Sequence, residues 1–281
     1  MDSVNSAKTA APGPTLRRAP NGLAYREVGR GQPLLLLHGL MAAGEMFDPL
    51  VERLQDDFRM LIPDLRGHAG SADLDPPYDS ATLARDVMQL MDDVGFQRGL
   101  VLGYSHGGTV AQELARARPQ AVAGMFLTCT YACNVLSTRE RIEGYILLAL
   151  HTFVGPSVLA KLIVRQGPTL GDMTAEQVTW LRSVIARNGR RQMRDAVRDG
   201  LLGFDSRPWL KDISVPTLVI AGSADRAVPR HHFDMLTSSI PGARGREVDG
   251  AGHALVWTHT SQLANIIRNQ AAAWAAAGAR T

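Results

Sequence analysis

The chain has 281 residues, of which 45% are hydrophobic, enough for one large domain with a sizeable core. Its formal charge of +3 comes from 30 basic and 27 acidic residues that are mixed along the chain, which argues against a nucleic-acid surface. The start of the chain has no apolar run of a secretion signal, and the apolar stretch 145–154 is too short for a bilayer. We therefore expect a cytoplasmic protein with a disordered tail over residues 1–15 and no membrane span.

Short apolar runs alternate with amphipathic stretches, which is typical of a parallel sheet covered by helices. Residues 23–29 and 33–39 are predicted to form an antiparallel pair that enters the sheet. The other strands and the helices follow in chain order: strand 58–64, helix 80–95 with Ser80 as N-cap and Gly95 as C-cap, strand 99–105, helix 107–118, strand 123–130, strands 215–222 and 243–250, and helix 261–277.

The alternation stops between Tyr131 and Pro208, where the pattern is helical without a convincing strand. We expect a helical cap over residues 132–207, inserted between the two core segments 16–131 and 208–281. The first half of this cap is strongly apolar, and we expect one face of it to roof a substrate pocket that Leu150 and Phe153 help to line.

In the second half of this segment, five arginines have spacings that place them on one face of a helix. Such a stripe is either a solvated basic face or a docking site for an acidic carrier or an anionic substrate. The five are Arg187, Arg190, Arg191, Arg194 and Arg198.

Neither the cysteines nor a histidine pair predicts a metal site. Cys129 and Cys133 are the only cysteines, and on one extended strand they would lie about 13 Å apart, too far for a disulfide. We expect both to be buried, reduced thiols. His231 and His232 have no neighbouring set of further ligands in the sequence, so we expect them at a solvated helix start, without a metal.

The stretch VLGYSHGGTV, residues 101–110, places Ser105 between two glycines where a buried strand turns into a helix. The G-x-S-x-G pattern is weak alone, but in this context the turn displays the hydroxyl. A serine hydroxyl needs a base and a carboxylate that orients the base. Asp225 and His253 each follow a predicted strand and complete the order Ser105, Asp225, His253. Asp249 is the weaker alternative acid, since it would need an unusual turn to reach His253.

These residues, with His38-Gly39 and the runs 63–68 and 222–229, resemble the α/β-hydrolase superfamily from about Gly22 to the closing helix. The similarity is to its serine-nucleophile branch with an inserted helical cap, which includes esterases, enol-lactonases and perhydrolases. The resemblance implies a doubly wound, mostly parallel sheet. It also implies that Ser105 is the nucleophile, that His253 is general base and then general acid, and that Asp225 fixes the tautomer of the imidazole.

The same resemblance implies an oxyanion hole made by the backbone N–H groups of Leu40 and His106. The side chain of His106 either has a role of its own in the site, or only its backbone N–H matters. His38 is expected to support the oxyanion loop near the substrate pocket, and Tyr104 is expected to line that pocket. Ala69 stands where relatives usually have glycine, so it costs about 1 kcal/mol if this residue needs a positive φ, unless the turn shifts to Gly70.

We therefore expect a serine hydrolase that cleaves a carboxylic ester or lactone of a small, partly apolar substrate through an acyl-enzyme, without a cofactor or a nucleic-acid partner. The resemblance also allows a thioesterase, a carbon-carbon bond hydrolase or a cofactor-free perhydrolase on the same residues. A non-catalytic ligand receptor on the same scaffold is a remote alternative. The sequence carries no signal for an oligomeric state.

Overall fold

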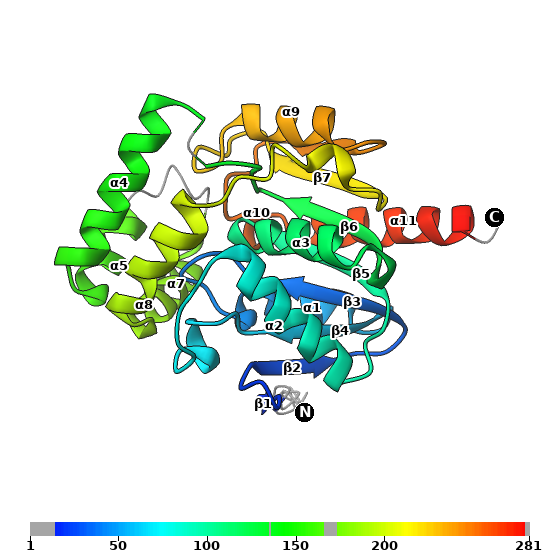
Figure 1. Cartoon of the computed structure of the whole chain (residues 1–281), viewed down its shortest axis with the longest axis horizontal. Coiled ribbons are helices and arrows are strands. Elements are labelled where there is room, and N and C mark those ends of the chain that lie inside the picture. The colour runs from blue at the N-terminus through cyan, green and yellow to red at the C-terminus, as the bar shows by residue number, and fades with distance from the viewer. Residues whose placement is uncertain (1–14, 135, 166–172, 279–281) are drawn as a thin grey trace, which may run out of the picture.

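The computed structural model in Figure 1 describes residues 15–134, 136–165 and 173–278. Its centre is an eight-stranded sheet in the order β1-β2-β4-β3-β5-β6-β7-β8. The pairings of β2 with β1 and β4 are antiparallel, and all the others are parallel. The strands are β1 (Arg17–Arg18), β2 (Ala24–Val28), β3 (Gln32–Leu37), β4 (Phe58–Pro63), β5 (Gly99–Tyr104), β6 (Val122–Thr128), β7 (Thr217–Gly222) and β8 (Arg244–Val248).

Helices follow most of the strands. They are α1 (Asp48–Leu54), α2 (Ser80–Asp93), α3 (His106–Ala117), α4 (Thr138–Phe153), α5 (Pro156–Arg165), α7 (Ala175–Arg187), α8 (Arg190–Ala196), α9 (Arg230–Ser239), α10 (Leu255–Thr258) and α11 (Thr260–Gly278). Short 3₁₀ turns occur at Gly44–Phe47, Ala69–Ser71, Pro119–Ala121 and Leu210–Asp212, and η4 (Val197–Leu202) is a π-helix. Among the helices of the described residues, none has the length and hydropathy that crossing a membrane requires.

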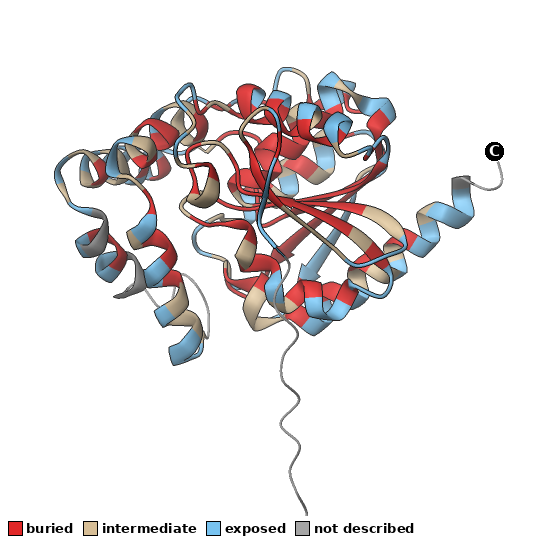
Figure 2. Cartoon of the chain, turned by 90° about the horizontal axis from the view of Figure 1, so that it is seen from below, coloured by how far each residue is buried: buried red, intermediate tan, exposed pale blue. Residues whose placement is uncertain are grey.

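Each face of the sheet has its own apolar core, because successive side chains of a strand point to opposite faces. On β3, Leu35 and Leu37 belong to the same apolar cluster as residues of α2, α3 and α9, whereas Leu34 and Leu36 belong to the cluster that includes residues of α1, α10 and α11. Figure 2 shows the strands buried between helices whose outer faces are exposed. Helices on both faces of a mostly parallel sheet confirm the predicted doubly wound α/β fold.

The predicted antiparallel pairing of residues 23–29 with 33–39 is wrong. β2 pairs with β4, and β3 lies between β4 and β5 in parallel with both. The reason lies in the connection after β2, where the backbone N–H groups of Arg30 and Gln32 donate to the carbonyls of Gln55 and Asp57, just before β4. These bonds place β4 between the two strands that the sequence suggested as partners.

Helix α2 begins one residue earlier than expected from the predicted N-cap, Ser80. Its N-cap is Asp79, whose carboxylate accepts from the backbone N–H of Thr82 at 2.9 Å, so Ser80 is the first helical residue instead. The Ser80 hydroxyl is buried and lies 2.6 Å from the hydroxyl of Thr109 on α3. At the other end, Gly95 has φ 67°, which is the left-handed conformation that the predicted C-terminal glycine supplies.

Helices α4, α5, α7 and α8 lie between β6 and β7 in the chain and gather together beside the carboxyl ends of the strands (Figure 1). We call them the inserted helices. The five arginines do not share one helix face, because α7 ends at Arg187 and α8 begins at Arg190. The break is fixed by Asn188, whose buried side-chain amide donates to the carbonyls of Met41 and Val184. Arg187 also pairs with Glu45 of the core.

Ala69 has φ 41°, so the left-handed turn residue stays at this position and does not shift to Gly70. An alanine in this conformation is strained, because its Cβ crowds the backbone. We expect Ala69→Gly to raise the free energy of unfolding by about 1 kcal/mol. The matched variant Ala72→Gly, at a right-handed φ of −67°, should instead lower it by about 0.5–1 kcal/mol. Urea unfolding of both variants measures this difference, and equal destabilisation would contradict it.

Candidate active site

Ser105 occupies a strained turn between β5 and α3. Its φ of 51° and ψ of −122° are unusual for a residue with a side chain. The turn closes because two flanking glycines allow backbone to pack on backbone. A Cβ on Gly103 would lie 2.5 Å from the carbonyl oxygen of Gly107, and one on Gly107 would meet the carbonyl oxygen of Leu37. The sequence prediction of a sharp strand-turn-helix at this serine is confirmed.

The structure brings Ser105, His253 and Asp225 together from the carboxyl ends of β5, β8 and β7. The Nε2 of His253 lies 3.2 Å from the Oγ of Ser105, and its Nδ1 lies 2.9 Å from the Oδ2 of Asp225. The Oδ1 of Asp225 accepts from the backbone N–H groups of Ala227 and Val228, both at 2.9 Å. The carboxylate is therefore held on both oxygens, and its side chain is only 2% exposed. Such an arrangement can move a proton from the serine to the imidazole.

Asp249 does not reach His253. It is exposed after β8, and its carboxylate accepts from the hydroxyl of Ser223 at 3.2 Å. Hydrogen bonds between the loops after β7 and β8 explain the choice, because they hold Asp249 and Gly250 beside Ser223, at the end of β7. The loop after β7 carries Asp225 back against His253, whereas Asp249 remains at the strand end.

Two backbone N–H groups near Ser105 are free to bind an anion. The N–H of His106 is the first of α3 and therefore has no intrahelical acceptor. In the described chain, no hydrogen bond engages the N–H of Leu40. Gly39 brings this second group close, since a Cβ on it would lie 3.2 Å from the Cβ of Ser105. The arrangement is suited to an oxyanion, although the role itself stays a prediction.

The imidazole of His38 supports the loop that carries Leu40, and its place in a substrate pocket stays a prediction. The Nδ1–H of His38 donates to the carbonyl of Gly39 at 2.8 Å, and its Nε2 accepts from the backbone N–H of Leu65 at 2.9 Å. Burial lowers the pKa of His38 to about 4 and that of His106 to about 3, so both imidazoles are neutral at physiological pH. The His106 ring is packed inward, close to Gly200 of η4.

Tyr104 is buried beside His253, and its place in a substrate pocket stays a prediction. It is 5% exposed, and its hydroxyl donates to the backbone carbonyl of His253 at 2.6 Å. The two rings are in contact, with centroids 5.3 Å apart. Tyr104 therefore holds the loop that carries His253, and its side chain belongs to the apolar core on the α1 side of the sheet.

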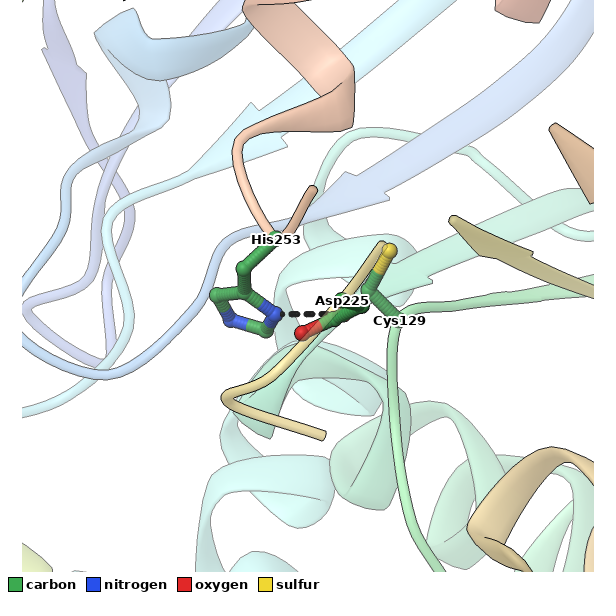
Figure 3. Close-up of side chains that lie close together, drawn as sticks. All are labelled: Cys129, Asp225 and His253. Atoms are coloured by element: carbon green, nitrogen blue, oxygen red, sulfur yellow. Dashed lines mark hydrogen bonds and ion pairs between the residues drawn. The ribbon is translucent and has the colours of Figure 1, made fainter. Parts of the chain in front are cut away.

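Cys129, which the sequence analysis treated only as a buried thiol, lies beside Asp225 and His253 (Figure 3). It follows β6 directly, has φ 49°, and is 2% exposed. Burial raises the pKa of this thiol well above its usual range, and the charge of Asp225 raises it further. The protonated thiol can then donate to Asp225. The sequence could have indicated this position, because Cys129 lies at the carboxyl end of the strand between the strands that precede Ser105 and Asp225. Cys129 and Cys133 are both free and buried, as expected.

Several apolar side chains of α4 are exposed, and the roof expected from the first half of the cap stays a prediction. Phe153 is 80% exposed, and Ile142, Tyr145 and Ile146 are also exposed. The buried stripe of α4 is Glu140, Gly144 and His151, and the apolar residues therefore fall on other faces of the helix. Leu150 is half-buried, and its place in a pocket stays a prediction.

The inserted helices reach the loop of Leu40 through polar and apolar contacts with the next residue, Met41. The Nε2 of His151 lies 3.2 Å from the sulfur of Met41, and Asn188 donates to its carbonyl at 2.8 Å. Met41 also packs against an apolar cluster formed by α5 and α7 with Trp257 of the core. This cluster consists of Ala160, Leu181 and Ile185, with Trp180 and Trp257 among the side chains packed on it.

His231 and His232 do not form a solvated helix start. The Nε2 atoms of both rings lie 2.7 Å from the Oε1 of Glu140, and His232 is 1% exposed. Burial lowers the pKa of His232. Glu140 lies in α4, far along the chain from the histidines, so no local sequence pattern pairs it with them.

The chain has a doubly wound sheet, with a strained serine turn, a histidine and a buried aspartate together at the carboxyl ends of the strands. Proteins with such sheets bind their ligands at this edge of the sheet. A family model described as the alpha/beta hydrolase fold matches residues 32–260, and the chain belongs to this family. The family membership supports hydrolase activity.

The chain is similar to several proteins that are named as hydrolases. A poly(3-hydroxyalkanoate) depolymerase from Ectopseudomonas oleovorans is 28% identical over 84% of this chain and 82% of its own. A pimeloyl-[acyl-carrier protein] methyl ester esterase from Neisseria meningitidis is 30% identical over 83% of this chain and 90% of its own. A solved thermophilic esterase from Thermogutta terrifontis has a TM-score of 0.80 and 25% identity, with 93% of this chain and 97% of that one covered.

Proposed function

We propose that this protein hydrolyses a carboxylic ester or lactone of a small, partly apolar substrate through an acyl-enzyme on Ser105. The observation that carries the proposal is the continuous contact from the Oγ of Ser105 through the imidazole of His253 to the buried carboxylate of Asp225. The esterase names among the relatives support the same substrate class.

In the proposed reaction, the Nε2 of His253 takes the proton of Ser105 while the Oγ attacks the ester carbonyl. The negative charge that develops on the carbonyl oxygen is stabilised by the N–H groups of Leu40 and His106. The imidazolium then protonates the leaving alcohol. Water repeats the sequence on the acyl-enzyme, with His253 as base, and releases the acid. Asp225 accepts from Nδ1–H throughout and keeps Nε2 available.

We further propose that the inserted helices are a cap that selects the substrate. Three features support this: His151 and Asn188 contact the residue after Leu40, Gly200 of η4, which directly follows α8, packs on His106, and α5 and α7 place apolar side chains around Met41. A substrate held between this cluster and Ser105 would therefore meet an apolar surface on its acyl or alcohol side. The segments 16–131 and 208–281 form the core in this proposal, and 132–207 forms the cap.

The test is the dependence of kcat/KM on acyl-chain length with p-nitrophenyl esters. Burial of each methylene contributes about 0.8 kcal/mol, so two added carbons should raise kcat/KM roughly tenfold until the site is full. We expect a rise from acetyl to medium chains and a fall for long ones. Truncation of Trp180 to alanine should flatten the rise, and Phe153→Ala should leave it unchanged because that side chain is exposed.

Three outcomes would contradict the proposal in different ways. No turnover of any activated ester would favour a ligand receptor on the same scaffold. A preference for thioesters over matched oxygen esters would favour a thioesterase. A flat profile, or one that favours acetyl alone, would reject the apolar cluster as the substrate-selecting surface while leaving the Ser105 chemistry intact.

A further inference from the structure

Two adjacent histidines converge on one carboxylate oxygen at the junction between the inserted helices and the core. The Nε2 atoms of His231 and His232, in the first turn of α9, each lie 2.7 Å from the Oε1 of Glu140 in the first turn of α4. Adjacent residues of a helix normally point about 100° apart, because a turn takes 3.6 residues. Here the two rings are nevertheless brought to 4.3 Å between centroids, with an interplanar angle of 43°.

The fold holds these three side chains in place. The other oxygen of Glu140, Oε2, accepts from the backbone N–H and the hydroxyl of Ser137 in a capping box, which leaves Oε1 directed at the histidines. The side chains of Glu140 and His232 are 8% and 1% exposed, whereas that of His231 is 47% exposed. Within the described residues, the Nδ1 of His232 has no hydrogen-bond partner. The cluster is therefore fixed on its inner side and open to solvent on one side.

We propose that Glu140, His231 and His232 form a binding site for a divalent transition-metal ion, Zn²⁺ in the first place. Two imidazole nitrogens and one carboxylate oxygen are ligands that Zn²⁺ takes, and the three donor atoms lie within 4.8 Å of one another. Zinc-ligand distances of about 2.0–2.2 Å place neighbouring donors about 3.3 Å apart. An ion therefore requires the donors to separate by roughly half an ångström, which the partly exposed ring of His231 can provide.

The bound ion connects two parts of the chain that carry the proposed chemistry. Glu140 belongs to α4 of the inserted helices, while α9, which carries His231 and His232, follows the loop that holds Asp225. An ion that binds only the folded chain raises the free energy of unfolding. The site thus fixes α4 to the core at a position outside the Ser105–His253–Asp225 cluster, with water as its fourth ligand on the side of His231.

Titration of the full chain, freed of metal by a chelator, with zinc chloride in a calorimeter tests the site. We expect one Zn²⁺ per chain and a higher Tm in the presence of the ion. His231→Ala and Glu140→Gln should each raise the Kd for Zn²⁺ at least about tenfold and remove the rise in Tm. Glutamine is chosen because it can still complete the capping box with Ser137, so that the start of α4 survives.

Two controls separate this site from other donors. Cys129, Asp225 and His253 form a second group that could hold a metal ion, so His253→Ala should leave the Zn²⁺ affinity unchanged. His259→Ala removes a histidine outside both groups and should also have no effect. The proposal is overturned if the parent chain shows no saturable binding, or if His231→Ala and Glu140→Gln bind as tightly as the parent. None of these measurements uses ester turnover, so they stand apart from the proposed function.

Discussion

Ser105→Ala should abolish ester hydrolysis, with a fall in kcat on the order of 10⁴-fold or more, while the fold remains intact. The hydroxyl is the only protein group that bonds to the acyl carbon in the proposed reaction, and no other described hydroxyl lies within hydrogen-bonding distance of the Nε2 of His253. Turnover of a medium-chain p-nitrophenyl ester measures the loss. Circular dichroism and Tm should match the parent, since alanine keeps the small size that the turn between β5 and α3 needs.

A fluorophosphonate probe gives the complementary result, because it reacts with activated serines. Peptide mass spectrometry should find the adduct on Ser105 in the parent and no adduct in the variant. Ser183→Ala is a matched control, since Ser183 is an exposed serine on α7 whose hydroxyl donates only to the carbonyl of Trp180. Labelling at another serine, or turnover that survives in Ser105→Ala, would show that the nucleophile is a different residue.

Local patterns in the sequence predicted most of the fold, because the core strands and helices carry strong periodic signals. The segments 99–105 and 107–118 correspond to β5 and α3 within one residue at each end. The pairing of β2 failed for the opposite reason. Which strand lies beside which depends on contacts between distant segments, here the bonds from Arg30 and Gln32 to the residues before β4, and no local pattern reports them.

The residues of the candidate site also divide into those that the sequence could predict and those that it could not. Ser105, Asp225 and His253 could be proposed because each follows a predicted strand, and parallel strands bring their carboxyl ends to one edge of a sheet. Cys129 and Glu140 were not found, because their partners lie far away along the chain and neither belongs to a short motif. The exposure of Phe153 could not be predicted, because hydrophobicity alone does not tell which face of α4 is buried, and small and polar residues form that face.

Asp225→Asn should lower kcat by about 10³ to 10⁴-fold, while Asp249→Asn should stay within about tenfold of the parent. The Nδ1 of His253 lies 2.9 Å from the Oδ2 of Asp225. An asparagine there can turn its oxygen toward the N–H groups of Ala227 and Val228, which already donate to Oδ1. Its amide group then faces Nδ1 and donates to it, so the imidazole carries its proton on Nε2. In that tautomer it cannot take the proton of Ser105.

The two aspartates make a matched pair, since both follow neighbouring strands and each is changed by the same substitution. Asp249 is exposed and contacts only the hydroxyl of Ser223 among the side chains of the described residues, so its loss removes no contact to His253. Steady-state kinetics with one ester, together with Tm values to confirm that both variants are folded, decide the question. A large loss in Asp249→Asn with near-normal turnover in Asp225→Asn would mean that the loops after β7 and β8 rearrange when substrate binds. The orienting carboxylate would then be Asp249.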